Sequence, residues 1–193
     1  MKRHLWTVVF TCAALALIGC GRSTPSQLYV LYSPELKAGA AVDKSIALDP
    51  VRIPKHLDRP VVMTQHSNTE MAFSETQRWA GPLANNITSV LKENLSKLLA
   101  NPNVYEARFG RKSADITLSI SLQQFSGELG EVAYLKAHWT LTQGDTEKSG
   151  ISEKRTELDD GGESVYVEAQ SKLLVMVAED VAAAIRTLAK ESK

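Results

Sequence analysis

Residues 114–122 read Ala-Asp-Ile-Thr-Leu-Ser-Ile-Ser-Leu, and residues 133–141 read Ala-Tyr-Leu-Lys-Ala-His-Trp-Thr-Leu. In both stretches apolar and polar side chains alternate, which is typical of a β-strand with one buried face. A glycine-containing turn at residues 128–131 separates them, so we expect an antiparallel hairpin. The apolar side of this hairpin has to be covered by other elements, and this requirement decides the fold class.

Two amphipathic helices are expected to supply the cover. The first is predicted from about Arg78 to Leu99, with Pro82 tolerated in its first turn. Its apolar face consists of Trp79, Leu83, Ile87, Val90, Leu91, Leu95 and Leu98. The second follows the glycines at 161 and 162, and its face consists of Val165, Ala169, Leu173, Met176, Val177, Val181, Ile185 and Leu188.

Further strands are predicted on both sides of the first helix. They are expected at residues 27–32, 45–54, 61–64, 70–73 and 148–158, the last of these near a sheet edge. Together these elements predict an α+β fold, a two-layer sandwich of a mainly antiparallel sheet packed against two long helices.

The first twenty residues have the features of an export signal. Lys2 and Arg3 precede an apolar run that is too short to span a bilayer, and the run ends in Leu17-Ile18-Gly19-Cys20. This pattern resembles the signal of bacterial lipoproteins, which implies cleavage before Cys20 and acylation of Cys20. The alternative is a plain signal peptide with an incidental cysteine.

The resemblance to lipoproteins divides the chain into three parts. Residues 1–19 are the expected signal peptide, 20–26 a lipidated tether, and 27–193 a single α+β domain. Gly21 is the second residue of the expected mature chain. In the lipoproteins that the signal resembles, the absence of Asp at this position favours transfer to the outer membrane, so the resemblance implies a location on its periplasmic face.

Composition excludes several function classes. The chain carries 22 basic and 22 acidic residues, a balance that does not favour nucleic-acid binding. Cys12 would leave with the signal and Cys20 would carry lipid, so no disulfide, cysteine nucleophile or cysteine-ligated zinc is expected in the domain.

Motifs of enzymes are missing from the sequence as well. Histidines 56, 66 and 138 have no metal-ligand spacing, and we find neither a Gly-x-Ser-x-Gly elbow nor a phosphate loop. We therefore predict no catalytic residue, no metal and no cofactor other than the covalent lipid on Cys20.

Three short stretches resemble the PqiC-like family of ABC-type transport auxiliary lipoproteins. They are Tyr29-Val30-Leu31, Leu57-Asp58-Arg59-Pro60-Val61-Val62 and Arg78-Trp79-Ala80-Gly81-Pro82-Leu83, with Gly81 where that family usually has Glu. The resemblance implies an auxiliary subunit that docks, as a homo-oligomer, on an MCE-domain protein spanning the periplasm.

Candidate partner-binding residues lie in these stretches and beside them. Asp58 and Arg59 could present a charged turn to a partner or a lipid headgroup, although Arg59 could also tie the turn to neighbouring carbonyls. Trp79 is either a core anchor or an interface residue. Tyr29 and Tyr32 have opposite strand parity, so one of them is expected to be exposed.

The leading functional hypothesis is a non-enzymatic adaptor of an MCE lipid transport system that supports envelope integrity. The alternatives are a periplasmic lipoprotein that binds a lipid itself or regulates a cell-wall enzyme and, less favoured, a hydrolase.

Overall fold

The structure is a computed structural model that describes residues 24–67, 69–107 and 114–191. The expected signal peptide and Cys20 therefore lie outside the described residues. In chain order the described elements are β1 (Gln27–Tyr29), β2 (Ile46–Leu48), β3 (Val61–Ser67), β4 (Glu70–Trp79), α2 (Leu83–Leu98), β5 (Val104–Glu106), β6 (Ile116–Glu128), β7 (Val132–Gln143), β8 (Thr146–Glu157) and α3 (Glu163–Glu191).

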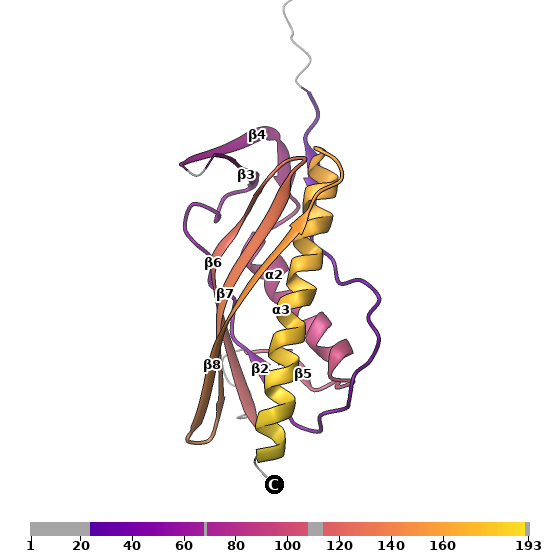
Figure 1. Cartoon of the computed structure of the whole chain (residues 1–193), viewed down its shortest axis with the longest axis vertical. Coiled ribbons are helices and arrows are strands. Elements are labelled where there is room, and N and C mark those ends of the chain that lie inside the picture. Colours follow the sequence, from indigo (N-terminus) through magenta and orange to yellow (C-terminus); the bar gives the residue numbers. More distant parts are fainter. Residues whose placement is uncertain (1–23, 68, 108–113, 192–193) are drawn as a thin grey trace, which may run out of the picture.

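The strands form two sheets. A five-stranded sheet has the order β5-β2-β6-β7-β8, and a three-stranded sheet has the order β1-β4-β3. Helix α3 runs along the long axis of the molecule against β7 and β8, and α2 packs beside it (Figure 1). The α+β prediction is confirmed.

The predicted hairpin is the centre of the larger sheet. Strands β6 and β7 pair antiparallel, with Leu118 opposite Leu141 and Ile120 opposite Trp139. The alternation holds, because the apolar positions of both strands are buried while their polar neighbours are half-buried or exposed. The buried positions are Ile116, Leu118, Ile120, Leu122, Ala133, Leu135, Ala137, Trp139 and Leu141.

Strand β6 continues past the predicted end at Leu122 by means of a bulge. The register shifts between Leu122 and Gln124, which leaves Gln123 exposed and turns the odd-numbered Phe125 inward. An extra residue in one strand reverses which parity faces the core. Phe125 is 3% exposed, so the bulge adds an aromatic side chain to the interior.

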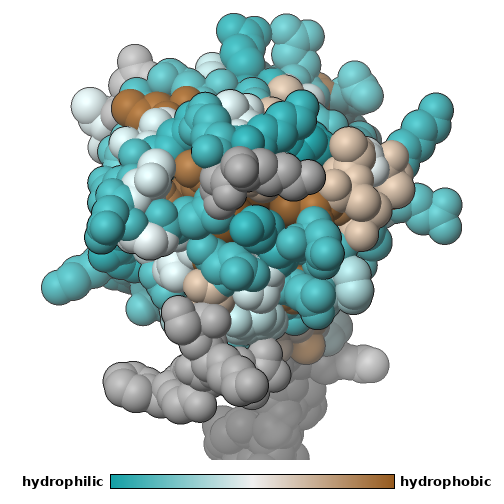
Figure 2. Space-filling view, turned by 90° about the horizontal axis from the view of Figure 1, so that it is seen from below, coloured by the Kyte–Doolittle hydropathy of each residue, from teal (hydrophilic) through white to brown (hydrophobic). Residues whose placement is uncertain are grey.

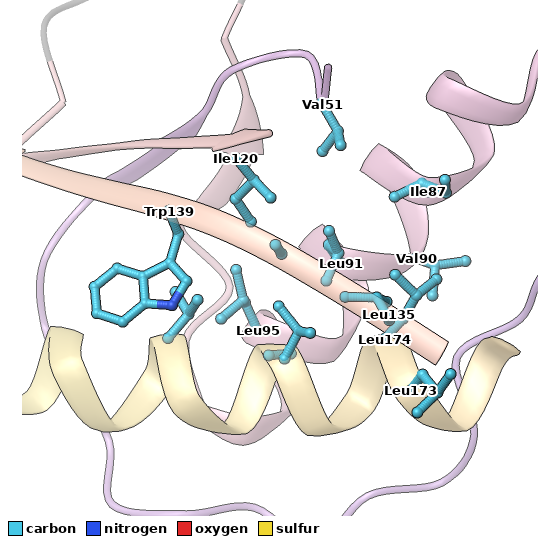
Figure 3. Packing of buried hydrophobic residues seen from close by; sticks show 14 of the residues in the cluster. Val51, Ile87, Val90, Leu91, Leu95, Ile120, Leu135, Trp139, Leu173 and Leu174 are labelled. Atoms are coloured by element: carbon cyan, nitrogen blue, oxygen red, sulfur yellow. The ribbon is translucent and has the colours of Figure 1, made fainter. Parts of the chain in front are cut away.

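The two helices close the core over this sheet. Leu91 and Leu95 of α2 and Leu173 and Leu174 of α3 belong to one buried cluster, which also includes Leu135 of β7 (Figure 3). All four side chains are fully buried. At roughly 1.5–3 kcal/mol for each fully buried apolar side chain, this layer is the main stabilising contribution.

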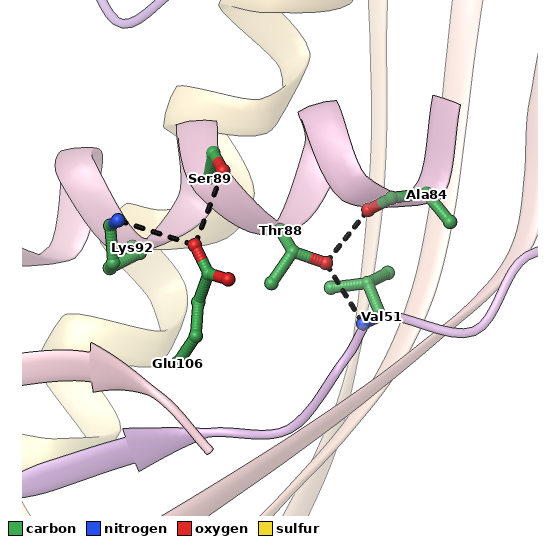
Figure 4. A network of polar contacts seen from close by, with 6 residues as sticks. All are labelled: Val51, Ala84, Thr88, Ser89, Lys92 and Glu106. Atoms are coloured by element: carbon green, nitrogen blue, oxygen red, sulfur yellow. Dashed lines mark hydrogen bonds and ion pairs between the residues drawn. The ribbon is translucent and has the colours of Figure 1, made fainter. Parts of the chain in front are cut away.

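Two groups of hydrogen bonds, one around Thr88 and one around Glu106, hold α2 to the neighbouring chain (Figure 4). The buried Thr88 hydroxyl donates to the Ala84 carbonyl at 2.7 Å and accepts the Val51 N–H at 3.0 Å. Glu106 of β5 accepts hydrogen bonds from Ser89 and Lys92, each at 3.2 Å. The helix is thus held to β5 and to Val51 in the segment that follows β2.

The predicted start of the first helix was wrong. Arg78 and Trp79 end β4, where they are the register partners of Leu28 and Tyr29, and the helix begins at Leu83. The residue before a proline is disfavoured in the helical region, so Gly81-Pro82 separates strand from helix. The spacing of Trp79 from Leu83 imitated a helical repeat by coincidence.

The sheet arrangement also differs from the expectation of one sheet. Strand β5 carries no alternation that would reveal it, and it forms because β2 offers a parallel partner. The predicted strand at 45–54 shortens to Ile46–Leu48, followed by an isolated bridge between Arg52 and Ser121. Strand β8 lies at an edge, as predicted.

Gly150 is required by the packing of Trp139, its cross-strand partner. A Cβ at Gly150 would overlap Cζ2 of the indole, so Gly150→Ala must displace this ring. We expect the free energy of unfolding to fall by about 1–3 kcal/mol in urea denaturation. Gly81→Ala is the control, since nothing lies within 4 Å of its Cβ. Equal stability of the two variants would contradict this packing.

Candidate docking surface

The three stretches that carry the family resemblance meet at one place in the structure. Tyr29 is the register partner of Trp79, and the Ala80 N–H donates to the Tyr29 carbonyl at 2.8 Å. The Trp79 N–H donates to the Pro60 carbonyl at 2.9 Å. The first strand, the Asp-Arg-Pro turn and the end of β4 are therefore joined by backbone hydrogen bonds, and we call this region the Trp79 junction.

Trp79 belongs to the core of this junction. Its side chain is 7% exposed and borders a cavity of only about 10 Å³. The cavity is lined by Leu57, Met63, Trp79, Leu83, Phe125 and Tyr166. These residues come from both sheets and both helices, so the indole holds the small sheet against the rest of the molecule.

Tyr166 of α3 completes the packing under the junction. Its hydroxyl donates to the Met63 carbonyl at 3.2 Å. Burial raises the pKa of this phenol far above its ordinary value, so the hydroxyl stays protonated and remains a donor. A buried polar group thereby keeps a partner.

Asp58 and Arg59 form the exposed part of the junction. Backbone hydrogen bonds close their turn, from Leu57 N–H to the Pro54 carbonyl at 2.9 Å and from Arg59 N–H to the Leu57 carbonyl at 2.8 Å. Both side chains are exposed. The Arg59 guanidinium makes no hydrogen bond or ion pair with a described residue that would occupy it, so it is free to meet a carboxylate or phosphate.

The two tyrosines of the first segment differ in exposure. Tyr29 is half-buried, and its hydroxyl donates to Gln27 at 2.8 Å. The pKa of Tyr29 is raised, first by burial and then by the nearby charge of Glu163. Tyr32 is 44% exposed, so of the two it offers more of its side chain for contact.

Leu31 fixes which side of this segment faces inward. The Asn86 side chain on α2 accepts the Leu31 N–H at 2.7 Å and donates to the Leu31 carbonyl at 3.1 Å. Leu31 is 2% exposed, and its neighbours Val30 and Tyr32 face solvent. Leu28 and Val30, 67% and 58% exposed, were not predicted as surface residues, because a continuous apolar run is usually read as a buried strand.

The polar clusters elsewhere are structural. Ser152, which is 1% exposed, accepts a hydrogen bond from the Trp139 indole N–H at 3.1 Å and donates to Asp180 at 2.7 Å. Lys154 pairs with the same carboxylate, which ties α3 to β8. Within the described ranges no group of histidine, cysteine or acidic side chains could hold a metal ion.

A sequence profile described as the ABC-type transport auxiliary lipoprotein component matches residues 29–182. The chain belongs to this family. The match includes all three stretches of the Trp79 junction. Among the described helices, none is both long and apolar enough to span a membrane.

One curated protein has a similar sequence, and two solved structures have a similar fold. The intermembrane transport lipoprotein PqiC of Escherichia coli (strain K12) is 27% identical over 145 residues, which cover 73% of this chain and 74% of PqiC. A crystal structure of a Xanthomonas campestris protein has a TM-score of 0.71 at 13% identity, covering 86% and 99% of the two chains. A crystal structure of an uncharacterized protein has a TM-score of 0.69 at 18% identity, covering 84% and 99%. Both structures share the fold.

Asn86→Ala tests how the first segment is held. It removes both bonds to the buried Leu31 backbone, so we expect a loss of about 1–3 kcal/mol in the free energy of unfolding and faster amide exchange at Leu31. Asn85→Ala is the matched control, because Asn85 is exposed one position earlier on α2. If the two variants exchange alike at Leu31, Asn86 does not hold the segment.

Proposed function

We propose that this chain is an outer-membrane lipoprotein, facing the periplasm, that acts as a non-enzymatic adaptor of an MCE-protein lipid transport system. Family membership supports the auxiliary role, and similarity to the intermembrane transport lipoprotein PqiC supports transport between membranes. The lipoprotein-like stretch Leu17-Ile18-Gly19-Cys20 supports covalent anchoring, since several acyl chains on one residue hold a protein stably at a bilayer.

The observation that carries the adaptor role is the exposed Asp58–Arg59 turn on the rigid Trp79 junction. A guanidinium held on a fixed turn can bind a partner carboxylate with two parallel hydrogen bonds. Because the turn is closed by its backbone and backed by Trp79, little conformational entropy is lost when a partner docks. An MCE-domain protein that reaches the outer membrane is the proposed partner, and homo-oligomerisation would present several such turns together.

The cavities argue for an adaptor over a lipid carrier. The apolar space beside Trp79 is about 10 Å³, whereas small-molecule sites usually measure some 300–1,000 Å³. A hollow of about 400 Å³ lies between the small sheet and β6, but polar side chains such as Gln65, Gln124 and Lys136 line much of it. Neither of these two spaces suits an acyl chain, and a third hollow, of about 320 Å³ between residues 40–44 and the end of α3, has Asp43, Lys44, Arg186 and Lys190 in its lining. The proposal is therefore that transported lipid passes along the partner.

Photocrosslinking in cells tests the proposed partner. A photoreactive residue in place of Arg59 is expected to form an adduct with an MCE-domain protein. The same probe at Arg155, whose side chain on β8 is 67% exposed, should not do so. Capture of only unrelated envelope proteins at positions 58 and 59 would refute the adaptor role.

Charge reversal tests the guanidinium itself. With the probe at Asp58, Arg59→Glu is expected to lower the adduct yield by about tenfold, because like charges at a contact repel. Arg155→Glu is the matched reversal and should leave the yield unchanged. An adduct that survives Arg59→Glu at full yield would show that Arg59 does not contact the partner.

A further inference from the structure

An exposed apolar stripe begins just beyond the expected tether. Leu28, Val30 and Tyr32 are 67%, 58% and 44% exposed, and they are three of the five large apolar side chains exposed among the described residues. Successive side chains of an extended segment point to opposite sides, so residues 28, 30 and 32 share one side while Tyr29 and Leu31 face inward. The bonds from Asn86 to Leu31 fix this orientation.

The stripe lies at the end of the molecule where the described chain begins. Strand β1 and the start of α3 occupy this end, and the C-terminal end of α3 lies opposite (Figure 1). Seen from the opposite end, the surface is mainly hydrophilic (Figure 2). Seven peptide units separate Cys20 from Gln27, and they can reach at most about 25 Å. A lipid on Cys20 therefore keeps the stripe close to the bilayer surface.

We propose that Leu28, Val30 and Tyr32 lie against the phospholipid surface that holds the Cys20 anchor, and so set the orientation of the domain on the membrane. This inference rests on the lipidation in the proposed function. Leu28 and Val30 precede Tyr32 in the chain, so the aliphatic side chains are nearest the anchor in sequence, and they are also the more exposed. Tyr32 is the farthest of the three from the anchor in sequence. Its apolar ring and polar hydroxyl suit the headgroup level of the bilayer, where apolar surface meets water.

The neighbouring charges fit a lipid headgroup. Arg78 is the register partner of Leu28 in the parallel β1–β4 pair, which puts its guanidinium on the same side of the sheet. At the other end of the stripe, the Tyr32 N–H donates to the Ser171 hydroxyl of α3 at 3.3 Å, next to Lys172, whose side chain is 60% exposed and pairs with Glu168 at 2.8 Å. Arg78 therefore places a cation beside the aliphatic end of the stripe, as expected where side chains enter the interface beside lipid phosphates, whereas Lys172 is already paired with Glu168.

The size of the stripe favours a membrane over a second protein. The exposed parts of the three side chains amount to roughly 300 Å², well below the ~800 Å² that each partner of a stable protein complex buries. A bilayer contact needs no such area, because the anchor already supplies the affinity and the stripe only selects an orientation. The sheet order β1-β4-β3 puts β1 at one edge and the Asp58–Arg59 turn, which leads into β3, at the other. The proposed membrane contact and the proposed partner contact thus lie at opposite edges of the small sheet.

Single cysteines can report this contact, because the mature chain would hold no free thiol. Leu28→Cys, Val30→Cys and Tyr32→Cys are labelled with an environment-sensitive NBD dye on the lipidated protein. The protein is placed in vesicles of phosphatidylethanolamine and phosphatidylglycerol with nitroxide-bearing lipid. We expect a blue shift, an emission gain of about twofold and nitroxide quenching, all strongest at 28, because water is excluded at the headgroup boundary. Ile151→Cys on β8 is the control, since Ile151 is equally apolar and 61% exposed.

Two other outcomes of this experiment would overturn the proposed membrane contact. A dye response that appears in detergent without nitroxide quenching, and that grows with protein concentration, would assign the stripe to contact between copies of the chain. Quenching at 28 no stronger than at 151 would show that the stripe faces water. In lipidated protein either result leaves the adaptor role standing, whereas protein found without lipid on Cys20 removes both proposals.

Discussion

The whole structure depends on burying the apolar face of α3 against the β6–β7 hairpin. Leu173, Leu174 and Val177 of this helix are fully buried, and small residues such as Ala133 and Ala137 on β7 let the helix approach closely. With no disulfide expected in the domain, packing has to supply the stability that many small exported domains obtain from covalent links. Every other element is positioned relative to this layer.

The candidate docking surface follows from that core in a few steps. The β6 bulge turns Phe125 inward, Phe125 and Tyr166 lie beside Trp79, and Trp79 joins the small sheet to the large one. The Asp58–Arg59 turn is thereby held by buried aromatic packing and by its own backbone bonds. A rigid support beneath exposed charged side chains suits recognition better than chemistry, and this agrees with an auxiliary lipoprotein family.

Sequence periodicity predicted the elements that bury one regular face. The hairpin and α3 were found because their alternation or helical spacing continues over many residues. Sequence periodicity failed where pairing between distant segments determines the local structure. Strand β5 forms because β2 offers a partner, and Trp79 ends a strand although its spacing from Leu83 matches a helical repeat. The docking residues were predicted from the family stretches, but their meeting at one junction depends on the parallel pairing of β1 with β4, which no local pattern reveals. The exposure of Leu28 and Val30 was missed because a continuous apolar run is usually read as a buried strand.

Anchoring at Cys20 is the central claim, because the adaptor role and the membrane contact of Leu28, Val30 and Tyr32 both require the domain to stay at a membrane. The most direct test is the intact mass of the protein extracted from membranes. The account predicts a chain that begins at Cys20 and carries the added mass of a diacylglycerol and an amide-linked acyl chain. A soluble chain with an unmodified N-terminus, at Cys20 or elsewhere, would contradict it.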